Sequence, residues 1–251
     1  MAKKLDAILY VCLYVAIYFF ANLIAGSIVP LFETLRLVVL GEIGWKYFFE
    51  RLSIALEIGG MTVLHAISAM AVALILIWFV FLIRKRRLFG AIKTKKLYFR
   101  DVAGAILIAF GLQAIAALVM KIPFPSALFE IYGRNMSINI SDNIILTLIT
   151  VGILVPFFEE IFFRGVIYNE LSTGGGFWFA NFFQSLAFAV LHFDIIQGTY
   201  AFFIGFALGA VMKIGKSLYI SVIIHIIFNA SNILFGQYIG AIASTPYFID
   251  C

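Results

Sequence analysis

Residues 144–171 read IILTLITVGILVPFFEEIFFRGVIYNEL, an apolar run that is long enough to cross a lipid bilayer. A bilayer-spanning helix needs about 20 predominantly apolar residues. Inside this run, VPFFEEIFFRGVIY (Val155–Tyr168) carries two adjacent glutamates and an arginine. A charged side chain at the centre of a spanning helix costs about 2.5–3.5 kcal/mol. The three charges therefore indicate a functional polar site inside a membrane helix.

The rest of the chain has the same membrane-protein character. Its 251 residues are 64% hydrophobic and only 12% charged, whereas soluble domains carry about 25% charged residues. We expect an all-α, polytopic transmembrane bundle of about seven to eight helices, with a four-helix catalytic core. Besides 144–171, the predicted spans are 7–29 (stopping at Pro30), 58–83, 102–120, 177–191, 195–212 and 217–235, and the apolar tail to Cys251 allows an eighth, short segment.

Two parts are expected within one membrane domain. Residues 1–140 form an N-terminal transmembrane scaffold, and residues 141–251 hold the polar intramembrane side chains. The scaffold includes an amphipathic segment at 31–57, which either lies on the membrane surface or packs as a lid on the bundle. It also includes a basic loop at 84–100, RKRRLFGAIKTKKLYFR.

The distribution of Lys and Arg predicts orientation and partners. With the N-terminus in the cytoplasm, 13 of the 18 Lys and Arg fall on the cytoplasmic side, as the positive-inside rule requires. We expect a multi-pass protein of the cell (plasma) membrane, with the lipid bilayer as its partner. Nucleic-acid binding is not expected, because no regular basic face is interleaved with aromatic residues.

The charges of the 144–171 run are predicted to divide their roles. Glu160 and Arg164 are four residues apart, so they share a helix face and can pair. Glu159 points about 100° away from Glu160, which leaves it without an obvious local partner and suits it to act as a general base. The alternative is that all three charges lie at the inner membrane edge, where water solvates them.

Two later helices repeat the four-residue spacing. FAVLH places Phe188 beside His192, and HIIFN places His225 beside Asn229. Taken alone, His192 is typical of a satisfied interfacial histidine, and His225 with Asn229 is typical of hydrogen bonding between helices. Together with Glu159 they predict a converged site, because isolated polar groups in a membrane are costly.

Estimated depths speak against a simple convergence. Ile144 is taken as the outer end of its span, which places Glu159 about 22 Å down, near the inner face. His225 is expected near the inner face as well. His192 lies 15 residues along a helix that starts inside at Phe177, so it is expected nearer the outer face.

The sequence resembles the CAAX-protease and bacteriocin-processing (CPBP, or Abi) intramembrane proteases in the order and placement of three motifs: E-E-x-x-x-R, F-x-x-x-H and H-x-x-x-N. The resemblance covers residues 144–235. It implies an endopeptidase that cleaves membrane-embedded or lipid-anchored peptides: leader, bacteriocin or signalling peptides, or CaaX-like C-termini. The resemblance also implies a role for each site residue. Glu159 would activate water, assisted by His192, and the oxyanion would be stabilised by His225 and Asn229. The site would be organised, or the substrate contacted, by Glu160, Arg164 and Phe188.

The sequence leaves the cofactor and two other functions open. Glu159, His192 and His225 could serve as three zinc ligands, but the chain lacks H-E-x-x-H and the Asn229 amide favours a metal-free mechanism without a cofactor. A non-catalytic self-immunity or peptide-binding membrane protein is the main alternative function. A small proton-coupled transporter is disfavoured, because the two halves show no paired repeats or broken helices.

Overall fold

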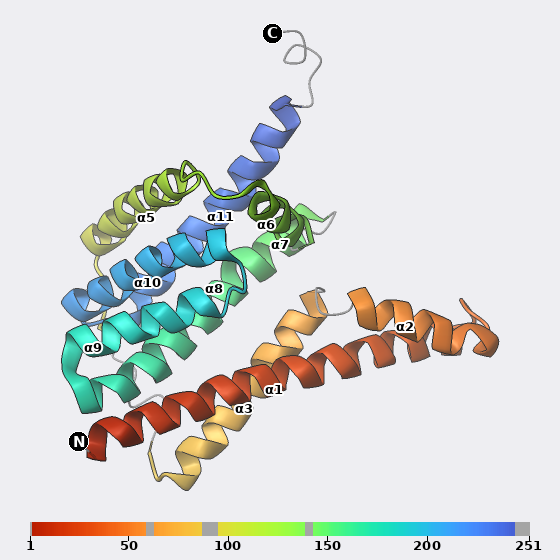
Figure 1. The fold of residues 1–251 in the computed structure, drawn as a ribbon, viewed down its shortest axis with the longest axis horizontal. Coiled ribbons are helices and arrows are strands. Elements are labelled where there is room, and N and C mark those ends of the chain that lie inside the picture. Colours follow the sequence, from red (N-terminus) through yellow and green to blue (C-terminus); the bar gives the residue numbers. More distant parts are fainter. Residues whose placement is uncertain (1, 59–62, 87–94, 139–142, 244–251) are drawn as a thin grey trace. The chain divides into compact units, whose positions relative to one another are not determined.

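The computed structural model describes residues 2–58, 63–86, 95–138 and 143–243, and within these ranges it is helical without any strand. The expected all-α fold class is therefore confirmed. The elements in chain order are α1 (Ala2–Val39), η1 (Trp45–Tyr47), α2 (Phe48–Ile58), α3 (Val63–Ile83), α5 (Phe99–Val119), α6 (Ser126–Ile138), α7 (Ile144–Thr147), η3 (Leu148–Leu154), α8 (Val155–Glu159), η4 (Glu160–Tyr168), α9 (Asn169–Val190), α10 (Ile195–Gly215) and α11 (Leu218–Ala243) (Figure 1).

Among the described residues, six helices are long and apolar enough to cross a membrane, so the chain is a multi-pass membrane protein. The longest of them is the run Ile144–Val190, with 47 residues. It joins α7, η3, α8, η4 and α9 end to end, and the backbone breaks at Gly176, where φ is +71°. Counting the limbs before and after Gly176 separately recovers the predicted spans at 144–171 and 177–191, and gives seven in all.

The chain divides into two compact units, Met1–Gly90 and Ala91–Cys251. In the first unit, α1 packs against α3 and α2. Arg84 at the end of α3 donates from Nη1 to the Tyr14 hydroxyl at 2.7 Å and lies over the Tyr10 ring at 3.3 Å. His65 is buried in α3, with its Nε2 atom 3.4 Å from Asn22 Oδ1. It contributes to the packing of α3 on α1.

Helix α1 overturns one sequence-based boundary. The first span was expected to stop at Pro30, but α1 continues through it to Val39. An internal proline costs a helix about 3 kcal/mol, and packing of α1 against both α3 and α2 compensates for this cost. The Thr34 hydroxyl also donates to the Pro30 carbonyl at 2.8 Å. Consequently, the predicted amphipathic segment 31–57 is split between the end of α1, η1 and α2.

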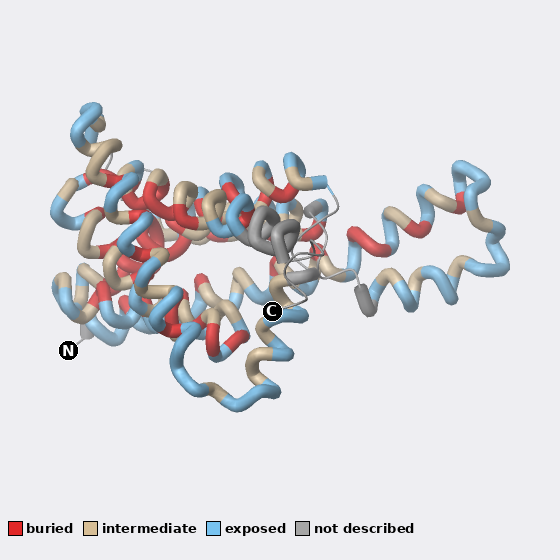
Figure 2. The backbone as a smooth tube through the Cα atoms, turned by 90° about the horizontal axis from the view of Figure 1, so that it is seen from above, coloured by how far each residue is buried: buried red, intermediate tan, exposed pale blue. Residues whose placement is uncertain are grey.

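In the second unit, α10 packs against α9 and α11, and α11 also packs against α5 and η3. Along these helices buried residues (red) alternate with exposed ones (pale blue) (Figure 2). All nine residues of η4 are buried, so this segment forms the centre of the unit. Helix α11 extends past the predicted end at 235 to Ala243. The last residues of the apolar tail, 244–251, and most of the basic loop, 87–94, lie outside the described residues.

Candidate active site

The centre of the second unit holds a fully buried ion pair. Arg164 Nη1 donates to Glu160 Oε1 at 2.7 Å, and both side chains have no exposed surface. The pairing predicted from the four-residue spacing is therefore confirmed. His225 Nδ1 lies 2.8 Å from the same Glu160 oxygen. Because a carboxylate paired with a guanidinium accepts hydrogen bonds, the His225 contact is a donation from Nδ1–H.

Arg164 is fixed by two further contacts from other helices. Its Nη2 atom donates to the Gly205 carbonyl on α10 at 3.2 Å. Its guanidinium lies 4.7 Å from the centre of the Phe188 ring on α9, a cation–π contact that gains strength where water is excluded. Glu160 and Arg164 thus organise the meeting point of η4, α9, α10 and α11.

Glu159 differs from its neighbour in its environment. Its side chain keeps 20% of its surface exposed, whereas that of Glu160 keeps none. Glu159 Oε2 lies 3.6 Å from His225 Nε2. The imidazole of His225 therefore stands between the two glutamates, with Nδ1 toward Glu160 and Nε2 toward Glu159. The rotation of about 100° between adjacent helix residues separates the two carboxylates in this way.

Phe188 brings the two histidines together. Its ring lies edge-on to His192 at 4.7 Å and to His225 at 5.7 Å between ring centres. The Nδ1 atom of His192 lies 2.6 Å from the Phe188 carbonyl. Since a carbonyl oxygen only accepts, His192 donates from Nδ1–H, and the neutral ring then keeps a lone pair on Nε2.

The predicted mismatch in depth is wrong. The helix that carries Glu159 does not end near Leu171 but runs on to the turn at Gly176. Glu159 comes 17 residues before Gly176 and His192 comes 16 residues after it. The Phe188 ring touches both His192 and His225, and His225 lies beside Glu159, so the three residues gather at one place.

Asn229 is held by a backbone carbonyl. Its Nδ2 atom donates to the carbonyl oxygen of Val151 on η3 at 3.1 Å. A side-chain amide has two N–H hydrogens, so the second hydrogen is available to another acceptor. Asn229 is half-buried, and His225, one turn earlier on α11, is buried.

Sequence reasoning missed a set of polar residues behind this site. Gln184 Nε2 donates at 3.0 Å to the Gly205 carbonyl that also binds Arg164. Asn181 Nδ2 donates to the neighbouring Phe206 carbonyl at 3.0 Å. Both amides are fully buried. The sequence feature that could have revealed them is the spacing of two polar residues by about one helical turn, on the α9 face that carries Phe188.

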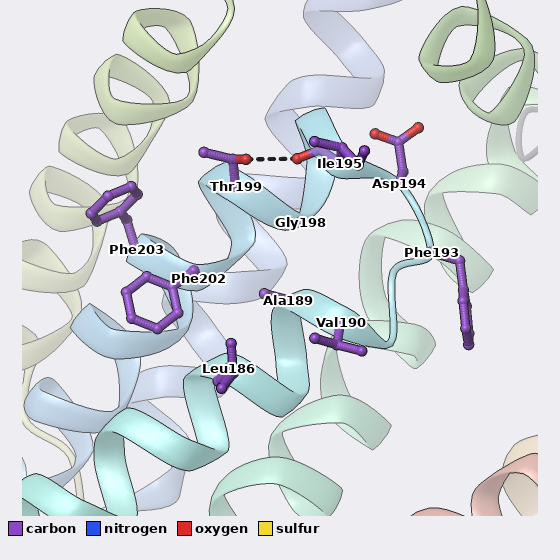
Figure 3. A pocket seen from close by; sticks show the side chains of 10 residues that line it. All are labelled: Leu186, Ala189, Val190, Phe193, Asp194, Ile195, Gly198, Thr199, Phe202 and Phe203. Carbon is purple, nitrogen blue, oxygen red and sulfur yellow. Dashed lines mark hydrogen bonds between the residues drawn. The ribbon is translucent and has the colours of Figure 1, made fainter. Parts of the chain in front are cut away.

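The apolar groove in Figure 3 lies on the other side of α9. The residues of α9 and the following turn that line it are Leu186, Ala189, Val190 and Phe193. At 100° per residue the three α9 positions 186, 189 and 190 centre about 155° away from Phe188. The groove is closed on its other side by α10 residues such as Phe202 and Phe203. It therefore faces away from the candidate active site.

The zinc alternative requires Glu159, His192 and His225 to direct three donor atoms at one ion. Within the described ranges, no three His, Cys, Asp or Glu side chains are grouped so that they could hold a metal ion. His225 uses Nδ1 for Glu160, and His192 uses Nδ1 for a backbone carbonyl. The Nε2 atom of each ring is therefore the one left for a ligand or a proton.

The fold and the site define a multi-pass membrane protein with a buried acid, imidazole and amide constellation. Residues 141–231 match the model of the family described as type II CAAX prenyl endopeptidase Rce1-like. This match confirms the resemblance to CAAX proteases that the three motifs indicate, and it supports an endopeptidase. No curated protein and no solved structure matches the chain.

Proposed function

We propose that this protein is an intramembrane endopeptidase that uses Glu159 and His192 to activate water, and His225 and Asn229 to bind the oxyanion. Glu159 has the exposure that a base in contact with water needs, whereas Glu160 is fully buried against Arg164. General base catalysis by a positioned side chain contributes about 10²–10⁴-fold to a rate.

The proposed reaction is hydrolysis of a peptide bond. Glu159 takes a proton from water, and the hydroxide adds to the substrate carbonyl. The oxyanion that forms accepts hydrogen bonds from the second amide hydrogen of Asn229 and, when His225 is protonated, from its Nε2–H. The proton then passes from Glu159 to the leaving nitrogen as the C–N bond breaks, which yields a carboxylic acid and an amine.

One observation carries this proposal: His225 contacts both glutamates, and Phe188 touches both histidines. Residues from η4, α9 and α11 therefore meet at one place, although they come from motifs up to 66 positions apart along the sequence. The 141–231 family match covers all three motifs.

The proposed substrates are membrane-embedded or lipid-anchored peptides, with prenylated C-a-a-X ends first among them, because the matching family is described as a CAAX prenyl endopeptidase. Leader and bacteriocin-type peptides are the second group. From the excess of Lys and Arg on one side we propose a cytoplasmic N-terminus, and we propose that the protein lies in the plasma membrane.

Cleavage by the purified protein in lipid nanodiscs tests the proposal. Two internally quenched peptides serve as probes: a farnesylated peptide with a C-a-a-X end and an unprenylated peptide with a hydrophobic leader. We expect cleavage of at least one of them, a loss of at least 100-fold in Glu159→Gln, and full activity in Glu130→Gln, which changes an exposed carboxylate on α6. Equal activity of Glu159→Gln and wild type would refute the role of Glu159.

A further inference from the structure

We propose that Pro156 is a positioning residue for Asn229, because it leaves the Val151 carbonyl without a helical donor and so makes it a fixed acceptor for the Asn229 amide. This inference rests on the proposed function, in which Asn229 binds the oxyanion. Pro156 stands between the apolar start of the span and the glutamates, and none of the three motifs includes it.

Around Val151, the backbone hydrogen-bond pattern of the helix provides no N–H donor for the Val151 carbonyl. In an α-helix the N–H of Val155 would bind the Val151 carbonyl, and in a π-helix the N–H of residue 156 would do so. Here the chain follows the π pattern, and the Val155 N–H donates to the Thr150 carbonyl. Residue 156 is proline and has no N–H. Neither helical donor therefore reaches the Val151 carbonyl.

A carbonyl that is shielded from water and has no donor is unfavourable, and the hydrogen bond from Asn229 removes this penalty. Its Nδ2 atom lies 3.1 Å from the Val151 oxygen, across the contact between η3 and α11. This contact is close, because a methyl group on Gly152 would meet the Ala230 Cα at 3.6 Å. The packing of Gly152 against Ala230 thus holds their neighbours, the Val151 carbonyl and the Asn229 amide, in place.

The consequence concerns the direction of the second amide hydrogen. An Asn side chain is planar, so a hydrogen bond from one N–H fixes the direction of the other. An oxyanion-binding donor contributes most when it is oriented before the reaction. Pro156 therefore contributes to the proposed reaction through the backbone, by the absence of one hydrogen, and touches neither substrate nor water.

The experiment compares two replacements of Pro156 in the full-length protein in nanodiscs. Pro156→Ala restores an N–H that competes with Asn229 for the Val151 carbonyl. The α-hydroxy acid analogue of alanine at position 156 has an ester oxygen there and restores none. Pro30→Ala in α1 is the matched control, because it adds an N–H to another internal helix position in the unit without the candidate site.

We expect Pro156→Ala to lower kcat for the farnesylated probe by about tenfold with KM within twofold of wild type, and the α-hydroxy analogue and Pro30→Ala to retain wild-type kcat. In an Asn229→Ala background, Pro156→Ala should cause no further loss. Equal losses in both replacements of Pro156 would overturn the inference, because the ring and not the N–H would then matter. A loss that multiplies with that of Asn229→Ala would overturn it as well.

A readout that does not depend on turnover separates this inference from the proposed function. The side-chain NH₂ signals of Asn229, assigned by their absence in Asn229→Ala, should shift in Pro156→Ala and stay in place in the α-hydroxy analogue. Unchanged signals in Pro156→Ala would refute the positioning of Asn229. Failure of the wild-type protein to cleave either peptide would count against the proposed function alone.

Discussion

Glu160 and His225 lie 65 positions apart in the sequence, and the Glu160 Oε1 atom is 2.8 Å from His225 Nδ1. The same carboxylate oxygen binds Arg164 at 2.7 Å. One buried oxygen therefore connects η4 to α11 and fixes which ring nitrogen of His225 faces Glu159. In the proposed mechanism the two adjacent glutamates therefore have different tasks: Glu159 is the base, and Glu160 holds the helices together.

Glu160→Gln should destabilise the protein strongly. Removing one partner of a buried ion pair typically costs about 3–5 kcal/mol, because the other charge stays buried without compensation. Here the uncompensated group is Arg164, which has no exposed surface. Thermal unfolding of the purified protein in detergent measures this loss. A transition temperature equal to that of wild type would contradict the assignment of Glu160 as an architectural residue.

Glu159→Gln should have the opposite profile, with activity lost and stability retained. Its side chain is partly exposed, and its carboxylate oxygen Oε2 lies 3.6 Å from His225 Nε2. Losing this contact should change the free energy of unfolding by less than about 1 kcal/mol, whereas kcat should fall by at least 100-fold. The two substitutions are chemically identical and one position apart, so each serves as the control of the other. Indistinguishable effects of the two on unfolding would contradict this division.

Local patterns predicted the helical class and the ion pair well. Apolar runs located the spans, and the four-residue spacing predicted the contact of Glu160 with Arg164, because both depend on neighbours along one helix. The predicted depth of His192 was wrong, because it depended on the position of the turn between the helical segments before and after Gly176. Gly176 marks that turn, but three consecutive glycines at 174–176 do not show from sequence which of them breaks the helix.

The sequence predicted that the polar residues of three helices converge, but not the individual contacts between helices. Pro30 and Pro156 look alike in the sequence, yet α1 simply continues through Pro30, whereas Pro156 follows a π-helical segment. Likewise, nothing in the sequence tells that the Gly205 carbonyl binds both Arg164 and Gln184. Such contacts depend on the rotation and register of helices that are far apart along the chain.

Metal chelators should leave the proposed activity unchanged. The described residues offer no group of three metal ligands, and in the proposed mechanism Glu159 activates water without a metal. Cleavage of the farnesylated probe after dialysis against EDTA and against 1,10-phenanthroline measures this. Loss of activity that added zinc restores would contradict the metal-free mechanism.

Gly205→Ala should reduce activity without unfolding the protein. A Cβ atom at this position would lie 3.0 Å from Phe188 Cδ1 and 3.4 Å from Ser185 Cα, so the Phe188 ring must move by a few tenths of an ångström. That ring touches both histidines and Arg164. A shift of this kind in a positioning group can cost a large part of the rate, and we expect kcat to fall by about tenfold or more.

The stability of Gly205→Ala should change little, because alanine favours the helix by about 1 kcal/mol over glycine and so offsets the crowding against Phe188. Gly111→Ala is the matched control: it lies inside α5, and a Cβ there would meet no atom within 4 Å. We expect Gly111→Ala to retain wild-type kcat with an equal or higher unfolding temperature. Wild-type kcat in Gly205→Ala would show that the position of Phe188 does not govern the arrangement of the two histidines.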